Sequence, residues 1–443
     1  MIYQMFNNVL GQVKGFGRLR IRGEVAGNVR LPREAMEALR GTLFRQRVGD
    51  AVERFPLYAA RAQEKMGRLP GGDEDIELHD LPIWTREDQK RHFESFDGPL
   101  DDDWFVHCTG GSSGQPLRFH VSRESYEWRM AVSDRGYSWA GAEEGRKSFF
   151  VWGAPALPIS IGQRIKSTLH HCVQRRAFFD SFQFGDEEKE ACCRDINRFR
   201  PNALVGYAGN LVELAKFVAG NPGLLKWRAQ SVVTAAEGLR GGERELLEDA
   251  LGGRVFMSYG SREFMLIGME CSEHAGYHIS SDNLIVEIVD EDGKVAAAGK
   301  AGRILVTDLR NAATPFIRYE IGDIGVIDDE QCSCGLPFPM LRRVDGRIQE
   351  IIYGTDGSKL SALFIPHLFK EFLWIDGYQL VQDKRSDLQV NIVCGCEVTK
   401  ELSDPVREEL LAKLGREMKI GFVRVEKLQK SASGKTPIVL HRD

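Results

Sequence analysis

The middle of the chain alternates short apolar runs with amphipathic helical segments. The helical periodicity is clearest over Asn210–Ala219 and Gly242–Ala250. The runs rich in β-branched or aromatic residues are predicted to be strands: Phe149–Trp152, Ala203–Gly206, Ser231–Ala235, Val255–Tyr259, Leu284–Val289 and Ile304–Asp308. Because parallel strands need a crossover connection, this alternation predicts an α/β domain with a largely parallel sheet. The last two strands, joined by Glu291-Asp292-Gly293, are predicted to form an antiparallel hairpin or small barrel.

Two domains are the simplest division of the chain. Residues 1–345 are predicted to form a large domain, in which residues 1–100 are a mainly helical lead-in that packs around the rest. Within the lead-in, a helix is predicted over Arg33–Arg61, with Pro32 in its first turn. Residues 346–443 are predicted to form a small, mobile α+β domain behind a hinge near residues 345–350. Its predicted elements are strands near Ile348–Tyr353 and Leu388–Val393, a helix from Pro405 to Lys419 and a strand over Phe422–Leu428.

Composition excludes several classes of protein. The formal net charge is -5, with 59 basic and 64 acidic side chains, which argues against nucleic acid or an anionic membrane as the main partner. No run of apolar residues is long enough to cross a bilayer, and the first residues do not resemble a secretory signal. Nine cysteines, two of them adjacent at Cys192-Cys193, do not suit a disulfide scaffold, so we expect a reducing cytoplasm.

The segment Thr109-Gly-Gly-Ser-Ser-Gly-Gln-Pro116 is the most informative motif. Six of its eight residues are Gly, Ser or Thr, so it offers backbone N–H groups and hydroxyl donors with little side-chain bulk. Those properties suit a loop that wraps a polyphosphate. A Gly/Ser run is also typical of a flexible linker. The flanking apolar segments Trp104–Val106 and Leu117–Val121 favour a turn between two strands instead.

This loop resembles the signature of adenylate-forming enzymes, which include acyl-CoA synthetases, adenylation domains and luciferases. The chain is most similar to the phenylacetate–CoA ligase branch and its capsule-biosynthesis, CapK-like relatives. Further motifs in the order of that family support the resemblance: Thr234-Ala-Ala-Glu237-Gly, Tyr259-Gly-Ser-Arg-Glu263, Pro315-Phe-Ile-Arg318-Tyr-Glu-Ile-Gly-Asp323, Gly346-Arg347 and Ser433-Gly434-Lys435.

The resemblance implies a role for each matching residue. Thr109, Gly110, Gly111, Ser112, Ser113 and Gly114 would close on the ATP phosphates. Glu237 and Tyr259 would lie against the adenine, and Asp323 would accept the ribose hydroxyls. Glu263 would help to hold Mg²⁺, Arg347 would contact the ribose or phosphate, and Lys435 would lie between the acid and the α-phosphate. Taken alone, a Lys or Asp next to Gly is usually a turn residue or a solvated charge.

Three departures from the family pattern bear on activity. Gln115 stands where the loop usually has Lys, and Gly110 stands where it usually has Ser. Arg118 is a candidate for the missing positive charge. At the hinge, Gln349 stands at the usual pivot position, and the segment Tyr353–Lys359 also differs from its usual form. Because that region lines the thiol tunnel in the family, an acceptor other than CoA stays open.

A metal site is predicted from cysteine and histidine spacing. Cys271, His278, Cys332 and Cys334 could supply three thiolates and one imidazole to a tetrahedral Zn²⁺, with His274 as a competing ligand. Some members of the resembled branch have similarly placed residues. Four protein ligands leave no open position, so the zinc would be structural. Ordinary buried cysteines are the alternative, as we expect for the strand residues Cys394 and Cys396.

The resemblance implies ATP-dependent activation of a carboxylic acid as acyl-AMP, with release of pyrophosphate and transfer to CoA. The alternatives are transfer to an amine or carrier, and a nucleotide-binding protein without catalysis. ATP, Mg²⁺ and CoA are the expected cofactors and co-substrate. The partners would be small molecules, with no nucleic acid or membrane, and a homodimer stays open. An aromatic or medium-length acid would fit a pocket predicted from these residues, for which core packing is the alternative: Trp152, Phe179, Tyr207, Ala208, Ala235 and Phe264.

Overall fold

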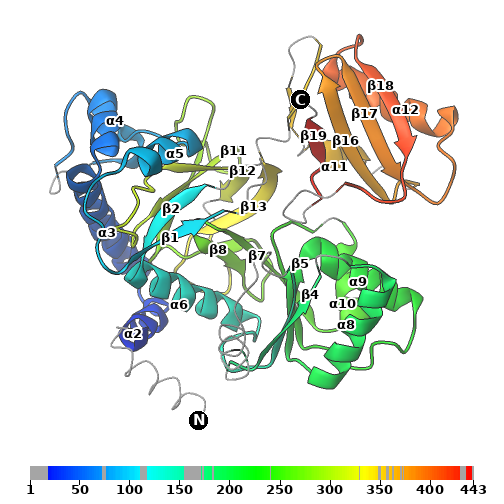
Figure 1. The fold of residues 1–443 in the computed structure, drawn as a ribbon, viewed down its shortest axis with the longest axis horizontal. Coiled ribbons are helices and arrows are strands. Elements are labelled where there is room, and N and C mark those ends of the chain that lie inside the picture. The colour runs from blue at the N-terminus through cyan, green and yellow to red at the C-terminus, as the bar shows by residue number, and fades with distance from the viewer. Residues whose placement is uncertain are drawn as a thin grey trace. The chain divides into compact units, whose positions relative to one another are not determined.

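The computed structural model forms two compact units (Figure 1). The first unit extends to Val344 and the second begins at Asp345, with Gly322–Ile324 grouped with the second. The structure describes residues 18–71, 76–109, 117–153, 171, 174–181, 184–239, 241–328, 330–347, 351–355, 359–361, 364–369, 372, 374–429 and 436–441.

The first unit contains most of the helices and strands. Its helices are α2 (Arg18–Asn28), α3 (Arg33–Arg54), α4 (Pro56–Met66), α5 (Arg86–Ser95), α6 (Arg123–Trp139), α8 (Asp186–Phe199), α9 (Ala208–Gly220) and α10 (Glu243–Leu251), with a 3-10 turn at Leu78–Asp80. Its strands are β1 (Trp104–Cys108), β2 (Arg118–Ser122), β3 (Ser148–Trp152), β4 (Arg176–Asp180), β5 (Ala203–Tyr207), β6 (Ser231–Ala235), β7 (Arg254–Ser261), β8 (Met265–Glu270), β9 (Tyr277–Ile279), β10 (Leu284–Val289), β11 (Ala301–Asp308), β12 (Tyr319–Asp328) and β13 (Met340–Arg347).

One mixed sheet organises this unit. Among the described residues its strand order is β10-β11-β12-β13-β9-β8-β7-β6-β5-β3-β4. Strands β4, β3, β5, β6 and β7 are parallel, whereas β7, β8, β9 and β13 pair antiparallel. The predicted α/β class with mixed sheets is therefore confirmed. The hairpin predicted at 284–289 and 304–308 is also confirmed, as β10 and β11 pair antiparallel at the end of this sheet.

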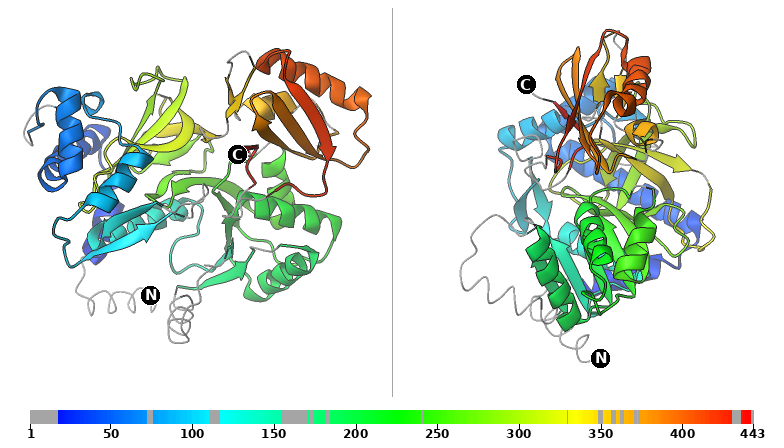
Figure 2. Two further views of the ribbon diagram at one scale, coloured as in Figure 1. Left: turned by 45° about the horizontal axis from the view of Figure 1, so that its top comes forward. Right: turned by 90° about the vertical axis from the view of Figure 1, so that its right-hand side faces the viewer.

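The parallel strands are buried on both faces. Helices α8, α9 and α10 lie beside the parallel strands (Figure 2). Side chains of these helices and of β3, β5, β6 and β7 form one apolar cluster. A second cluster on the same strands includes Phe150, Val205, Val233 and Phe256 together with Leu266. Burial on both faces explains why these strands are continuous apolar runs in the sequence.

The helical lead-in differs in detail from its prediction. The helix predicted over residues 33–61 is two helices, α3 and α4, which are separated by Phe55. Phe55 is extended, with φ -122° and ψ 94°, because the ring of Pro56 disfavours helical conformation in the residue before it. Pro32 precedes the helix as its N-cap rather than lying in the first turn.

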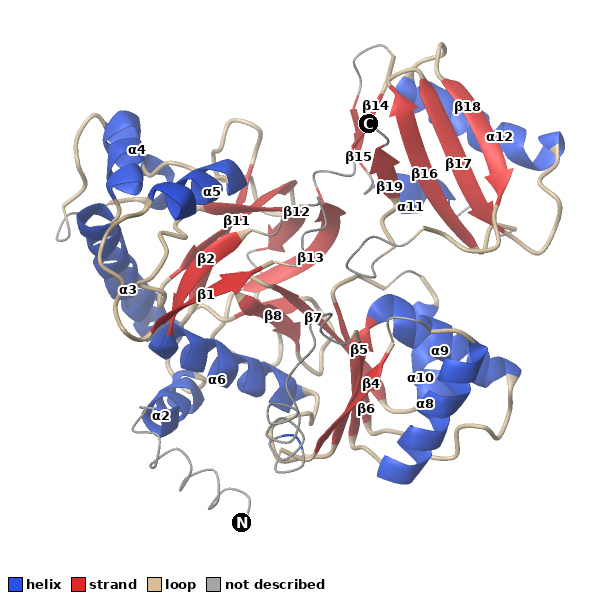
Figure 3. Ribbon diagram, viewed as in Figure 1, coloured by secondary structure: helices blue, strands red, loops and turns tan. Residues whose placement is uncertain are grey.

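The second unit is an α+β domain (Figure 3). Its strands are β14 (Ile351–Tyr353), β15 (Lys359–Ser361), β16 (Gly377–Lys384), β17 (Asp387–Val393), β18 (Lys419–Arg424) and β19 (Val439–His441), and its helices are α11 (Phe364–Phe369) and α12 (Lys400–Leu414). Four of the strands form a sheet in the order β18-β17-β16-β19. The buried residues Leu380, Val390 and Ile392 of this sheet form one cluster with Val406 and Leu410 of α12.

Two boundaries predicted in this unit were wrong. The helix expected from Pro405 to Lys419 spans Lys400–Leu414, with Pro405 inside it. It stops at Gly415, whose φ of 91° ends the helical conformation, so the next strand starts at Lys419 rather than Phe422.

Cys394 and Cys396 follow β17 instead of lying in it, and the Cys394 thiol contacts the Cys396 carbonyl oxygen at 3.1 Å.

Within the described parts of the chain, none of the helices is long and apolar enough to span a bilayer.

Candidate functional site

The predicted phosphate loop is closed at its base by Thr109. Gly110–Pro116 lie outside the described residues, but both flanking strands are present, and β1 pairs with β2 from Trp104↔Ser122 to Cys108↔Arg118. The Thr109 amide donates to the Leu117 carbonyl at 3.0 Å, and the Leu117 amide donates to the Thr109 hydroxyl oxygen at 2.9 Å. The residues on the two sides of the segment therefore belong to paired neighbouring strands, and the Thr109 hydroxyl helps to hold Thr109 and Leu117 together.

Three predicted pocket residues meet at the carboxyl ends of the parallel strands. Trp152 ends β3, Tyr207 ends β5 and Ala235 ends β6, and Tyr207 pairs with Ala235. The rings of Trp152 and Tyr207 lie 4.3 Å apart. In open α/β sheets, ligands bind outside this edge. The grouping is therefore placed where a ligand site is expected.

Glu237 lies beside this group. Its carboxylate oxygen Oε2 is 3.0 Å from the position that a Cβ atom on Gly209 would occupy. Gly209 is the second residue of α9, so the absence of a side chain there lets the carboxylate approach the first turn of the helix. Ala236, the preceding residue, has a positive φ of 73°, which turns the chain at the end of β6.

The turn from β7 into β8 carries the predicted Mg²⁺ ligand. Glu263 is 7% exposed, and among the residues that the structure describes none forms a hydrogen bond or ion pair with its carboxylate. Its charge helps to raise the pKa of Tyr319, although burial is the larger cause. A nearly buried carboxylate with no described cation partner fits a hard divalent cation. Tyr259 of β7 and Asp323 of β12 are both 8% exposed.

The structure places two other predicted pocket residues elsewhere. Phe179 packs against the apolar cluster under α8–α10, where its ring lies 6.2 Å from that of Phe184. Phe264 is fully buried and lies 5.3 Å from Phe316 and 6.0 Å from Tyr319, ring to ring. These contacts favour core packing, the alternative to a pocket role, for Phe179 and Phe264. Ala208, the first residue of α9, is also buried.

The C-terminal candidates are only partly described. Lys435 and Gln349 lie outside the described residues. Arg347 is the last residue of β13, and only its backbone is described. Arg118 is described and exposed at the start of β2. Within the motif that ends at Asp323, Arg318 is structural: its buried guanidinium donates to Glu287, the Leu81 carbonyl and the Gly293 carbonyl.

The predicted zinc ligands lie together. Their ligand atoms, from Cys271, His278, Cys332 and Cys334, are all within 4.8 Å of one another. The two sulfurs of Cys271 and Cys332 are 3.6 Å apart, and His278 Nε2 is 3.3 Å from both the Cys271 and the Cys334 sulfurs. A tetrahedral zinc site requires about 3.8 Å between two sulfurs and about 3.5 Å between sulfur and nitrogen, from bonds of about 2.3 and 2.0 Å. The donor set and spacing fit Zn²⁺.

Strand pairing builds this cluster. Cys271 follows β8, His278 lies in β9 opposite both Met269 of β8 and Met340 of β13, and the two other cysteines lie in the turn before β13. His278 Nδ1 lies 3.5 Å from the Phe338 carbonyl oxygen, to which it can donate, so that Nε2 faces the sulfurs. Burial lowers the pKa of His278, which favours the neutral form that a metal ligand needs.

His274 is not part of the cluster. Its Nδ1 lies 3.2 Å from Glu270 Oε2 and 3.2 Å from the Arg244 guanidinium. Arg244 also makes a two-bond ion pair with Glu270, at 2.9 and 3.0 Å. The competing ligand suggested by the sequence is therefore held in a separate polar group.

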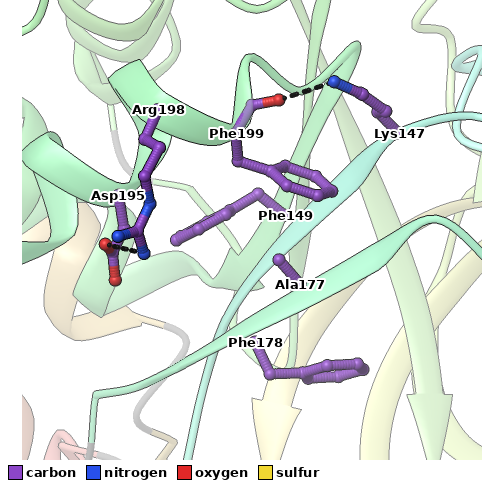
Figure 4. Close-up of a pocket in the computed structure, with 7 residues that line it drawn as sticks. All are labelled: Lys147, Phe149, Ala177, Phe178, Asp195, Arg198 and Phe199. Atoms are coloured by element: carbon purple, nitrogen blue, oxygen red, sulfur yellow. Dashed lines mark hydrogen bonds and ion pairs between the residues drawn. The ribbon is translucent and has the colours of Figure 1, made fainter. Parts of the chain in front are cut away.

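A surface hollow lies at the opposite end of the parallel strands (Figure 4). It is lined at the start of β3 and β4 and the end of α8 by Lys147, Phe149, Ala177, Phe178, Asp195, Arg198 and Phe199. Its polar groups are already paired: Lys147 donates to the Phe199 carbonyl at 3.0 Å, and Arg198 pairs with Asp195 at 2.9 Å. We therefore assign the candidate site to the carboxyl ends.

Comparison with known proteins shows what the chain is similar to. A model described as the CapK C-terminal domain matches residues 352–442. The phenylacetate-coenzyme A ligase of Thermus thermophilus is 27% identical over 398 residues, which cover 86% of this chain and 84% of that protein. Protein CapK of Staphylococcus aureus is 21% identical, over 81% of this chain and 79% of that protein. The chain is therefore similar to phenylacetate–CoA ligase and CapK over most of its length, and its C-terminal part matches the CapK family model.

A solved structure supports the same fold. The crystal structure of 2-hydroxyisobutyryl-CoA ligase in the postadenylation state, in complex with 2-HIB-AMP, has a TM-score of 0.71 with this chain at 18% identity. The likeness covers 93% of this chain and 90% of that one. The adenylate-forming fold predicted from the motifs is therefore confirmed for nearly the whole length.

One charged residue near the candidate site was missed in the sequence analysis. Burial raises the pKa of Tyr207, and the positive charge of Arg262 opposes that shift. The same charge, together with Arg129, adds to the burial that lowers the pKa of His107. Arg262 is thus close to residues on both β1 and β5, at the candidate site. Arg262 directly precedes Glu263 in the sequence, and this position next to a predicted site residue could have indicated that Arg262 lies near the site.

The metal site gives a direct test. We expect Cys334→Ser to remove one of four ligands, so zinc content should fall well below the parent's ratio of about one per chain. The free energy of unfolding should fall by at least about 2 kcal/mol, because metal binding is coupled to folding. Metal analysis and chemical denaturation measure both. Cys396→Ser, in a second Cys-x-Cys pair, is the matched control and should change neither; equal zinc in the two variants would contradict the site.

Proposed function

We propose that the chain is an AMP-forming ligase that activates a carboxylic acid as acyl-AMP, releases pyrophosphate and then transfers the acyl group to CoA. The observation that carries this proposal is the carboxyl edge of the parallel strands, where Trp152, Tyr207 and Ala235 meet. The CoA-ligase names of two similar proteins support both half-reactions.

Both half-reactions displace a leaving group. In the first, a carboxylate oxygen of the acid attacks the α-phosphorus of ATP, and pyrophosphate leaves with the electron pair of the broken P–O bond. In the second, the acceptor thiolate attacks the acyl carbon, and AMP leaves. Because the acid and ATP are both anions, the protein must mainly neutralise charge and align the reacting atoms.

Each proposed role uses groups of matching chemistry. Glu263 would hold Mg²⁺, which supplies positive charge to the phosphates when bound. Thr109–Gly114 would bind the phosphates through backbone N–H and hydroxyl groups, while Tyr259, Glu237 and Asp323 would hold the nucleoside. Arg347 would contact the ribose or phosphate. Lys435 would place its ammonium between the acid and the α-phosphate.

The small domain would serve both steps. We infer that the segment near residues 346–350 is a hinge, so that Lys435 takes part in adenylation and leaves before acyl transfer. The boundary at residue 345/346 belongs to the same proposal.

The acid is proposed to be aromatic or of medium length. Trp152 and Tyr207 offer apolar ring surface beside Ala235, whose small side chain leaves room in the same row of strand ends. Phe179 packs against one apolar cluster and Phe264 lies within another, which favours core packing, the alternative stated for these two residues.

The chain departs from the family pattern in the region expected to bind the acyl acceptor, and this departure favours a second candidate for the acceptor. The segment Tyr353–Lys359 differs from the usual form of the region that lines the thiol tunnel. An amine or a carrier is therefore the alternative to CoA.

We also propose a reducing, cytoplasmic setting and small-molecule partners; the described cysteines are free thiols.

Pyrophosphate exchange with a panel of aryl and medium-chain acids tests the adenylation step. We expect labelled pyrophosphate to enter ATP only when a suitable acid is present, because the first step is reversible and needs no acceptor. ATP binding measured in parallel is the control. Binding without exchange for every acid would instead support a nucleotide-binding protein without catalysis, an outcome that Gln115 and Gln349 keep open.

The Lys435→Ala variant tests the role of the C-terminal lysine. We expect exchange to fall about 100- to 1,000-fold, the loss that follows removal of one group aimed at transition-state charge. ATP affinity should stay near the parent value. Lys430→Ala, five residues earlier in the same segment, is the matched control and should keep the parent rate. Parent-like exchange in Lys435→Ala would show that another group carries this charge.

Omission of CoA from a full-turnover assay tests the acceptor. We expect AMP release to drop to a slow hydrolytic rate without CoA and to recover on its addition, because the acyl-AMP then has a thiol to attack it. The assay is repeated with amines in place of CoA. If an amine gives undiminished acyl product and CoA gives none, the acceptor is an amine and the proposed transfer to CoA is wrong.

A further inference from the structure

The buried side chain of Gln379 bonds the chain on both sides of the lysine segment. Gln379 lies in β16 and is 0% exposed. Its oxygen Oε1 accepts from the Gln429 amide at 3.1 Å, and its nitrogen Nε2 donates to the Gln429 carbonyl at 3.0 Å. The same nitrogen donates to the Pro437 carbonyl at 2.9 Å. One amide group therefore joins residue 429 to residue 437, and Lys435 lies between them.

The two ends of the segment depend on Gln379 to different degrees. After Pro437, the chain is also held by the pairing of β19 with β16, where the Leu380 amide donates to the Ile438 carbonyl at 2.8 Å. Before Lys430, the preceding backbone bond runs from the Val425 amide to the Ile392 carbonyl. Among the described residues, Gln379 makes the only hydrogen bonds to the Gln429 backbone.

This arrangement constrains where Lys435 can be. Lys435 is two residues before Pro437 in the sequence, and two residues span at most about 7 Å, so a fixed Pro437 carbonyl limits how far from it the chain at residue 435 can reach. The same side-chain amide also bonds Gln429, so it holds residues 429 and 437 together. The entropy cost of bringing these two ends together is therefore met when the domain folds and not when the substrate binds. A misplacement of about 1 Å can cost a reaction about 100-fold.

We propose that Gln379 is a positioning residue for Lys435: it touches no substrate, but its buried amide holds both ends of the lysine segment in the geometry that adenylation needs. The inference rests on the role proposed above for Lys435. It adds a residue from a different strand, outside every motif of the sequence analysis.

The same strand offers a matched control. Gln382 is 4% exposed and makes the same pair of bonds to the Tyr353 backbone: its Oε1 accepts from the Tyr353 amide at 2.9 Å, and its Nε2 donates to the Tyr353 carbonyl at 2.8 Å. The same nitrogen makes a longer bond of 3.4 Å to the Arg385 carbonyl. Substitution of Gln382 removes an equivalent set of buried bonds from β16 but leaves the lysine segment held. The two variants thus separate a positioning effect from a loss of domain stability.

The test compares Gln379→Met with Gln382→Met. We expect Gln379→Met to lower kcat for pyrophosphate exchange about 100-fold with KM for ATP within about twofold of the parent. Discharge of pre-made acyl-AMP to the acceptor should continue at the parent rate, because Lys435 has left by then. Gln382→Met should keep exchange within about threefold, since its partners lie outside the lysine segment.

Hydrogen exchange followed by mass spectrometry supplies a readout without catalysis. In Gln379→Met, the peptide that contains Gln429 should exchange faster, whereas in Gln382→Met the peptide that contains Tyr353 should do so. If Gln379→Met does not fold, Gln379→Glu replaces it: this variant keeps the acceptor for the Gln429 amide and loses both donated bonds, and it should also lose exchange activity.

The outcomes separate the two proposals. If Lys435→Ala keeps the parent rate, the lysine has no role in adenylation, and the positioning role falls with it. If Lys435→Ala loses exchange but Gln379→Met keeps it, only the inference on Gln379 is overturned. Equal losses of kcat in the Gln379 and Gln382 variants would show a general effect of domain stability and would also overturn it.

Discussion

The parallel pairing of β3, β5, β6 and β7 determines most of what this protein can do. Parallel strands end at one edge, so Trp152, Tyr207 and Ala235 lie together although they are far apart in the sequence. The turn after β7 then delivers the buried Glu263. Since both faces of these strands are covered, the carboxyl edge is where a ligand can reach the sheet. The chemistry proposed for the protein depends on this edge.

Polar side chains bond the residues that flank the segments proposed to act on ATP. Thr109 closes the base of the phosphate segment, and Gln379 bonds both ends of the lysine segment. In each case these bonds join the described residues on the two sides of the segment. The cluster of Cys271, His278, Cys332 and Cys334 has a comparable effect on the turn before β13, because a metal there would join that turn to β8 and β9.

The sequence predicted the fold better than it predicted individual contacts. The strands at 149–152, 203–206 and 231–235 were recognisable because burial on both faces makes them continuous apolar runs. Boundaries failed where one backbone feature decided them, as at Phe55 before Pro56 and at Gly415. The grouping of Cys271, His278, Cys332 and Cys334 could be predicted because these donor types are rare. Phe179 and Phe264 could not be separated from pocket residues, because an aromatic side chain in a strand or turn gives no sign of which face it packs on. Arg262 and Gln379 were missed because the groups near them are far away in the sequence.

The central claim is that this protein joins a carboxylate oxygen to the α-phosphorus of ATP. Turnover with a carboxylic acid labelled with ¹⁸O in both carboxylate oxygens tests it directly. The account predicts AMP that carries one ¹⁸O atom and pyrophosphate that carries none, because the acid oxygen stays on phosphorus when the acyl group leaves. Unlabelled AMP, or label in inorganic phosphate, would contradict it.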